Sequence, residues 1–191
     1  MSGGYQVSEH EVSVENTLIS NGFLKSKIKK ITKLQLKKAL NGGDIPELKE
    51  GEYISQPTGK NSSPDFIVRY NGKLYFIECK SSNKTYPVYN GGLPGEEYIY
   101  IFTSKETNET TIFYGKDVLK SEKRELYSKL LVELNQILHK YQNMPKWEDK
   151  SRGFDYYIRN MYTQNGSAEK TNYFKHEGRL ICEQNVLNSI R

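Results

Sequence analysis

Two carboxylates and a lysine stand close together in the sequence, in a pattern that can hold a divalent cation beside a phosphodiester. Asp65 begins one apolar segment, Glu78 ends the next, and Lys80 follows two residues later. Carboxylate oxygens bind Mg²⁺, which keeps several waters and completes its shell with phosphate oxygens. The ion offsets charge on the phosphate and acidifies an attacking water, which a nearby lysine can orient. The three residues are therefore the candidate catalytic set for hydrolysis of a phosphodiester bond.

The segment that carries these residues predicts a β-hairpin. Residues 65–70 and 73–78 are rich in β-branched and aromatic side chains, and Asn71-Gly72 between them favours a type I′ turn. A hairpin folds the strand ends furthest from its turn back beside each other, so both carboxylates should lie at one end of the sheet. The glutamate and the lysine should share a face because side chains alternate along a strand.

Pro64-Asp65, twelve intervening residues and then Glu78-Cys79-Lys80 resemble the PD-(D/E)xK signature of restriction endonucleases and archaeal Holliday-junction resolvases. The resemblance implies an α/β fold with a restriction-endonuclease-like core, in which a central mixed β-sheet is flanked by helices. It also implies that the two carboxylates bind Mg²⁺ and that the backbone carbonyl of Cys79 is a further ligand. The lysine would position the water, and the products would carry 5′-phosphate and 3′-hydroxyl ends.

A first helix is expected over residues 8–21. In the resolvase branch of the family, a metal-site glutamate on this helix precedes a Gly-Phe pair, which Gly22-Phe23 resembles. By that spacing Glu11 is the better candidate for a further metal ligand, and Glu15, one turn on, is the alternative. Glu11 also stands where a capping box needs a glutamate, and that structural role alone explains it equally well.

Residues 24–40 are expected to form a second helix, which carries seven lysines and no acid. Such a face suits either a phosphate backbone or plain solvent. A short strand is expected over 52–56, followed by a polar loop. Lys60 in that loop resembles the lysine of a Gly- and Lys-bearing loop in resolvases, which implies a phosphate contact; a free surface lysine is the alternative.

The chain after the hairpin departs from the simplest family pattern, αβββαβ, because residues 81–97 contain prolines and glycines that oppose a helix. A long loop at the active-site end is expected there, followed by strands over 98–102 and 111–114. A helix is expected over 121–142, with an apolar stripe that faces the core. The stripe consists of Leu126, Leu130, Leu131, Leu134, Ile137, Leu138 and Tyr141.

The composition changes after residue 143, where aromatic side chains alternate with polar and basic ones. Residues 1–143 are expected to be the nuclease core, and 144–191 an appendage for DNA recognition or dimerisation within the same compact domain. Segments 154–162 and 172–182 are expected to pair as a second hairpin, which would make the appendage β-rich; completing the sheet is the alternative role. The side chains expected to contact DNA are Lys60, Arg152, Arg159, Asn160, Gln164, Lys170 and Lys175.

The composition of the chain limits the number of domains, the kinds of partner and the cellular setting that we expect. The 191 residues suffice for one domain, and 28 basic against 23 acidic side chains give a net charge of +5, compatible with a polyanionic partner. The two cysteines have no metal spacing and predict a reducing, cytoplasmic setting, and no apolar run is long enough for a membrane helix. Motifs for ATP binding, zinc-dependent deamination and a serine nucleophile elbow are absent from the sequence.

These observations predict a type II restriction endonuclease that acts on double-stranded DNA with Mg²⁺. A homodimer is expected because two-fold symmetry matches palindromic sites, and a cognate DNA methyltransferase would belong to the same system. A structure-selective endonuclease resembling the Holliday-junction resolvases is the alternative. A DNA-binding module without catalysis is a third class, against which the intact acid, acid and lysine set argues.

Overall fold

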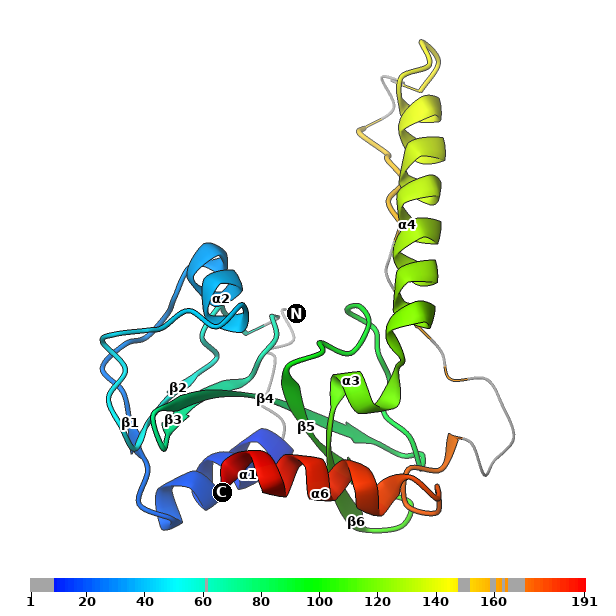
Figure 1. Cartoon of the computed structure of the whole chain (residues 1–191). Helices are drawn as coiled ribbons and strands as arrows, with labels where there is room; N and C mark the ends of the chain where they lie inside the picture. The colour runs from blue at the N-terminus through cyan, green and yellow to red at the C-terminus, as the bar shows by residue number, and fades with distance from the viewer. Residues whose placement is uncertain (1–8, 61, 148–151, 159–160, 163, 165–170) are drawn as a thin grey trace.

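The computed structural model describes residues 9–60, 62–147, 152–158, 161–162, 164 and 171–191. Its centre is a six-stranded mixed sheet in the order β1-β2-β3-β4-β5-β6 (Figure 1). The β1–β2 and β4–β5 pairs are parallel, and the other neighbours are antiparallel. The strands are β1 (Leu24–Lys25), β2 (Glu52–Ser55), β3 (Phe66–Tyr70), β4 (Lys73–Ser82), β5 (Tyr98–Ser104) and β6 (Glu109–Tyr114). The predicted α/β class with a mixed sheet is confirmed.

The predicted hairpin is present as β3 and β4. Phe66 pairs with Ile77 at the open end. Asn71 and Gly72 form the turn with φ of 49° and 70°, the left-handed values that a type I′ turn requires. Both turn N–H groups donate to the carboxylate of Glu50, which fixes the turn from outside. The chain therefore enters β3 and leaves β4 at one end of the sheet, where the candidate residues lie.

The connection from β4 to β5 is a loop, as predicted, since no helix occurs in the described residues 83–97. It crosses to a parallel neighbour, in a register that places Glu78 beside Tyr100 and Lys80 beside Phe102. The loop consequently returns over the sheet end that carries the candidate residues.

Two helices cover one face of the sheet. α1 (Glu9–Ser20) and α6 (Arg179–Ile190) contribute Val14 and Val186 to a buried cluster with Tyr53 and other side chains of β2, β3 and β4 (Figure 1). Helix α2 (Lys33–Leu40) covers the opposite face through a second cluster, which includes Phe76. Even-numbered residues of β4 point to the α2 face, so Glu78 and Lys80 lie on that side.

The expected lysine-rich helix over 24–40 is wrong in its first half. Leu24 and Lys25 form β1 instead, and the segment up to Thr32 has no regular structure. Thr32 is the N-cap of α2 and forms a capping box with Gln35, so the helix begins nine residues later than β1 does. Pairing with the parallel edge of β2 outweighs the helix propensity of the lysines.

The expected β-rich C-terminal appendage is also wrong for the described residues. In place of a strand over 172–182, the chain forms turns and then helix α6. The only described β-bridge in 154–162 joins Tyr162 to Tyr89. The alternation of aromatic and polar side chains predicts strands, but packing on the sheet favours a helix at the end of the chain. Val186 of α6 is part of the core, with 1% of its surface exposed.

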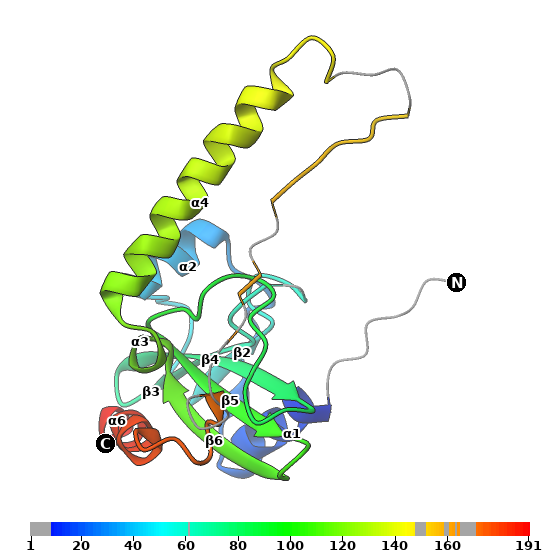
Figure 2. The ribbon, with the colours of Figure 1, turned by 90° about the vertical axis from the view of Figure 1, so that its right-hand side faces the viewer.

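Helix α4 (Ser121–Gln142), reached through the short α3 (Gly115–Val118), has the predicted bounds but not the predicted environment. It projects away from the sheet, as both ribbon views show (Figures 1 and 2), and none of its residues is buried. The apolar stripe that was expected to face the core is wholly or partly exposed. Periodicity identifies an apolar face but does not identify what covers it.

Among the described helices, none combines the length and apolar character that a membrane span needs.

Candidate active site

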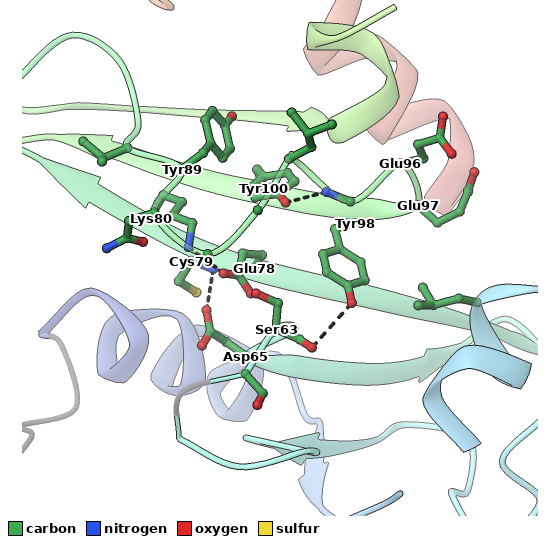
Figure 3. A pocket seen from close by; sticks show the side chains of 18 of the residues that line it. Ser63, Asp65, Glu78, Cys79, Lys80, Tyr89, Glu96, Glu97, Tyr98 and Tyr100 are labelled. Atoms are coloured by element: carbon green, nitrogen blue, oxygen red, sulfur yellow. Dashed lines mark hydrogen bonds and ion pairs between the residues drawn. The ribbon is translucent and has the colours of Figure 1, made fainter. Parts of the chain in front are cut away.

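The hairpin brings the two predicted carboxylates and the lysine together (Figure 3). Asp65 lies just before β3, and its N–H donates to the carbonyl of Ile77 over 2.9 Å, which closes the open end of the hairpin. Its Oδ2 accepts from the N–H of Cys79 at 2.7 Å. Lys80 Nζ donates to Glu78 Oε1 at 2.6 Å, on the face predicted from the alternation of the strand.

Burial makes this concentration of negative charge unfavourable. Glu78 is 4% exposed, and Asp65 is half-buried beside it. Burial first, and then the charges of Glu78 and Glu11, raise the pKa of Asp65 to about 7, although the Cys79 N–H and Lys80 act in the opposite direction. One lysine thus leaves the carboxylates short of positive charge, and a cation bound among them would supply it.

The donor set fits a Mg²⁺ ion. Oε2 of Glu78 is buried and has no hydrogen-bond partner, an unfavourable state for a carboxylate oxygen that a metal ion would relieve. Within the described part of the chain, no three His, Cys, Asp or Glu side chains form a ready-made metal site. Mg²⁺ commonly takes only one or two carboxylates and keeps waters, so Asp65 and Glu78 would suffice as its carboxylate ligands. The Cys79 carbonyl stays a predicted ligand.

The two candidate glutamates of the first helix contact different parts of the structure. Glu11 of α1 reaches the site, where Gln56 Nε2 donates to Glu11 Oε2 at 2.8 Å and to Asp65 Oδ1 at 3.3 Å. Glu15 is engaged elsewhere: it pairs with Lys25 at 2.8 Å and accepts from the hydroxyl of Tyr53 at 2.9 Å. The structure therefore brings Glu11, and not Glu15, to the side of Asp65.

Gln56 is a site residue that sequence reasoning missed. It follows β2 with φ of 50°, and its N–H donates to the carbonyl of Asp65 at 2.7 Å. Its Oε1 is buried without a hydrogen-bond partner. The sequence gives no signal for this role, because Gln56 reads as the start of a polar loop. A left-handed backbone in a residue other than glycine is the structural sign that its position is fixed by its surroundings.

The site opens into a cleft of about 980 Å³. One wall is the loop after β4, and the floor holds the tyrosines of β5. Tyr100 accepts from the N–H of Gly95 at 2.8 Å and meets Tyr89 edge to face, and Tyr98 donates to the carbonyl of Ser63 at 3.4 Å (Figure 3). Burial and the charge of Glu78 raise the pKa of Tyr98 to about 12, so it remains a neutral phenol. The loop is thereby held over the carboxylates.

The residues predicted to contact DNA do not form one surface. Lys60 lines the cleft, as does Asn41 at the end of α2. Gln164 instead donates to the carbonyl of Pro87 at 3.2 Å, which ties the C-terminal segment to the loop. Arg152 and Lys175 are exposed and do not line the cleft. Arg159, Asn160 and Lys170 lie outside the described residues.

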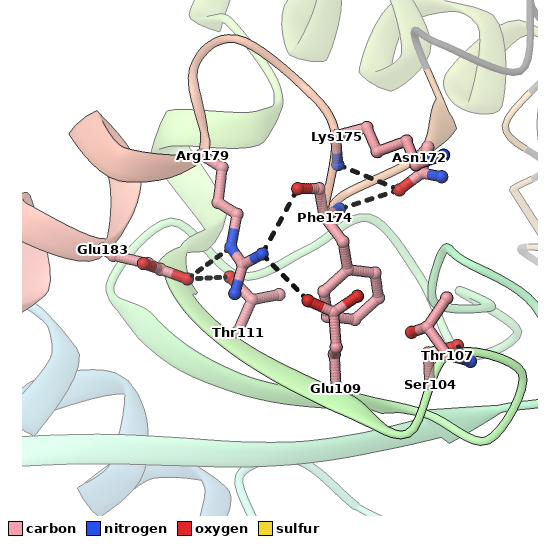
Figure 4. Close-up of polar contacts among 9 residues, drawn as sticks. All are labelled: Ser104, Thr107, Glu109, Thr111, Asn172, Phe174, Lys175, Arg179 and Glu183. Atoms are coloured by element: carbon pink, nitrogen blue, oxygen red, sulfur yellow. Dashed lines mark hydrogen bonds and ion pairs between the residues drawn. The ribbon is translucent and has the colours of Figure 1, made fainter.

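A polar network beside Lys175 anchors helix α6 (Figure 4). Arg179 pairs with Glu183 at 2.8 Å and with Glu109 of β6 at 3.4 Å, and it donates to the carbonyl of Phe174 at 3.2 Å. The hydroxyl of Thr111 on β6 donates to the same Glu183 carboxylate at 2.7 Å. These contacts give the segment a structural role in holding the last helix on the sheet.

In comparisons with known proteins, no family model, no curated protein and no solved structure matches the chain.

Proposed function

We propose that this protein is a Mg²⁺-dependent endonuclease that hydrolyses phosphodiester bonds in double-stranded DNA. One observation carries the proposal: Asp65, Glu78 and Lys80 meet at the open end of a hairpin, inside a cleft, with a buried carboxylate oxygen left unpaired. The order of elements around them, a mixed sheet with the hairpin at its centre and helices on both faces, suits a restriction-endonuclease-like core.

Each residue has a role that its position supports. Asp65 and Glu78 would hold Mg²⁺, which when bound offsets phosphate charge and acidifies water. Lys80, already 2.6 Å from Glu78, would orient the water whose oxygen attacks phosphorus as the bond to the 3′ oxygen breaks. The leaving oxygen takes a proton, which gives 5′-phosphate and 3′-hydroxyl ends. Gln56 would hold Asp65 and Glu11 at fixed positions around the ion.

We further propose that the protein is a type II restriction endonuclease, which reads a DNA sequence as a homodimer and whose host DNA is protected by a methyltransferase. A structure-selective endonuclease is the second candidate. The presence of Glu11 beside Asp65 favours it, because this is the first-helix glutamate expected from the resolvase branch.

A cleavage assay with purified protein tests the proposal. Plasmid and linear duplex DNA, a four-way junction and an RNA duplex are incubated with Mg²⁺ or with EDTA. Discrete bands from linear DNA support a restriction enzyme, and cutting confined to the junction supports a structure-selective one. If none of the DNA substrates is cut with Mg²⁺, the nuclease proposal is wrong.

Matched variants connect any activity to this site. Asp65→Ala, Glu78→Ala and Lys80→Ala should each abolish cleavage, while Lys105→Ala and Glu106→Gln, exposed and outside the cleft, should retain it. Circular dichroism checks that the inactive variants fold. Full activity in a site variant would remove that residue from the mechanism.

A further inference from the structure

The positive charge of the chain is concentrated in one segment beside the cleft. Residues 24–41 hold seven lysines and no acidic side chain, whereas the rest of the chain has 21 basic against 23 acidic side chains. This segment therefore accounts for the whole of the net positive charge. Lys25 pairs with Glu15. The other six are exposed and form no ion pair within the described part of the chain: Lys27, Lys29, Lys30, Lys33, Lys37 and Lys38.

Helix α2 directs two of these lysines toward the cleft. Ala39 is buried between α2 and the sheet, and Leu40 at the end of the helix lines the cleft (Figure 1). At 100° per residue, Lys33 and Lys37 lie about 20° and 60° from Leu40 around the helix, on the side away from Ala39. Both ammonium groups are therefore within reach of an anion at the mouth of the cleft.

The helix carries these two lysines against its own stability. Lys33 stands in the first turn, at the positive end of the helix dipole, and no acidic side chain accompanies it there. Lys37 follows four residues later, at a spacing where like charges on a helix repel. Their positions are nevertheless fixed, because Thr32 caps the helix and the N–H of Ile31 donates to the carbonyl of Pro57 at 2.8 Å. Phosphate groups beside the two lysines would relieve both repulsions.

The loop after β4, which forms another wall of the cleft, has its acidic side chains already paired. Glu96 pairs with Arg124 at 3.2 Å and Glu97 with Lys116 at 3.3 Å. These two glutamates line the cleft without adding unpaired charge to it. Unpaired positive charge near the cleft therefore lies on the α2 side and at Lys60, so a polyanion is attracted from that side.

We propose that the six exposed lysines form a basic surface that binds the phosphate backbone of duplex DNA beside the bond to be cut. This inference rests on the proposed function, since it says where the endonuclease holds its substrate. Contacts between lysine and phosphate orient a duplex but do not read its sequence. The basic surface thus supplies affinity that is independent of sequence. Each such contact releases condensed counterions, so binding weakens steeply as the salt concentration rises.

Fluorescence anisotropy with a labelled DNA duplex in EDTA measures this contact without cleavage. The triple variant Lys33→Gln, Lys37→Gln, Lys38→Gln keeps residues that favour a helix and should have an unchanged circular dichroism spectrum. It should bind the duplex at least about tenfold more weakly near ~0.1 M salt, because three phosphate contacts are lost. The slope of log affinity against log salt concentration should fall in magnitude by about 2–3.

A matched control removes the same charge from exposed lysines that do not line the cleft and should bind nearly as the wild type does. It consists of Lys120→Gln, Lys129→Gln and Lys140→Gln. Equal losses in both triple variants, unchanged binding by the α2 variant, or a wild type that does not bind the duplex would overturn the proposal. Cleavage is scored separately. A wild type that cuts DNA while the α2 variant binds normally refutes the basic surface alone, and loss of binding in an α2 variant of a protein that never cuts refutes the nuclease alone.

Photo-cross-linking locates the duplex without changing several charges at once. Lys37→Cys and the control Lys129→Cys are made in a Cys182→Ser background and labelled with an azidophenacyl group; the remaining Cys79 is buried. Irradiation with the duplex should cross-link DNA to the reagent at position 37 and not to that at position 129. Cross-linking at position 129 alone, or at neither position, would refute the proposed surface.

Discussion

Replacing Asp65 by asparagine should stabilise the metal-free protein at neutral and alkaline pH. The folded-state pKa of Asp65 is raised from 3.8 to about 7, chiefly by burial and then by the charge of Glu78. A carboxyl group with a raised folded pKa binds its proton more tightly in the folded than in the unfolded chain. The stability that it contributes is therefore present below about pH 4 and is lost as pH rises through the window to about 7. An asparagine side chain removes this loss because it never ionises.

The magnitude follows from the size of the shift. A rise from 3.8 to about 7 is roughly three units, which sets an upper limit of about 4 kcal/mol at 1.36 kcal/mol per unit. The asparagine carbonyl can still accept from the Cys79 N–H, so that hydrogen bond survives. Because the charge repulsion is shared with Glu78, we expect a gain in unfolding free energy of roughly 1–3 kcal/mol at pH 8.

Urea unfolding in EDTA, monitored at pH 4, 6 and 8, measures this effect. The difference between Asp65→Asn and wild type should be near zero at pH 4 and largest at pH 8. Adding Mg²⁺ at pH 8 should stabilise the wild type and do much less for the variant. Glu106→Gln, an exposed carboxylate elsewhere, is the control and should follow the wild type. Equal stability of variant and wild type at pH 8, or a gain that does not depend on pH, would show that Asp65 is not under this repulsion.

Five further variants test contacts of the site and the core. Lys80→Arg should retain the charge yet lose most cleavage, because a guanidinium cannot repeat the short contact to Glu78; unchanged rates would argue against a positioned amine. Gln56→Ala should raise the Mg²⁺ concentration needed for half-maximal cleavage, with the fold retained by circular dichroism. Glu11→Gln should do the same, whereas Glu15→Gln should leave the Mg²⁺ dependence alone and lower the unfolding free energy by roughly 1 kcal/mol, measured in urea. Val186→Ala should lower the unfolding free energy by about 2 kcal/mol, because this side chain is buried in the core; an unchanged unfolding free energy would contradict its burial.

Local sequence determines the hairpin and with it most of the candidate site. Asn71-Gly72 fixes the turn, and a strict two-residue alternation then places Glu78 and Lys80 on one face, so their meeting with Asp65 follows from a window of about twenty residues. No distant contact is needed for that inference. The same reasoning fails at Gln56, which lies before the hairpin and connects Asp65 to Glu11, 45 positions earlier in the chain.

The wrong expectations share one physical cause. Leu24-Lys25 and helix α6 take their structures from pairing with β2 and packing on β6, and neither partner is visible in the local pattern. For α4 the pattern gave the helix correctly and its bounds at both ends, but an apolar stripe has the same period whether the covering surface belongs to the same chain or to another. Exposure of Leu130 and Ile137 is thus information that only the structure supplies.

The position of Asp65 explains how residues from both faces of the sheet could hold the proposed ion. Cys79 points to the α1 side, into the cluster that contains Val14, whereas Glu78 points into the cleft on the α2 side. Asp65 precedes β3 at the open end of the hairpin, where one carboxylate oxygen accepts from the Cys79 N–H and the other from Gln56 Nε2. Helix α1 lies close enough to this edge of the sheet for the Glu11 carboxylate to accept a hydrogen bond from Gln56. The proposed metal site would require the hairpin, α1 and β2 to be folded together, which is why Glu11 and Gln56 could not be predicted from the hairpin alone.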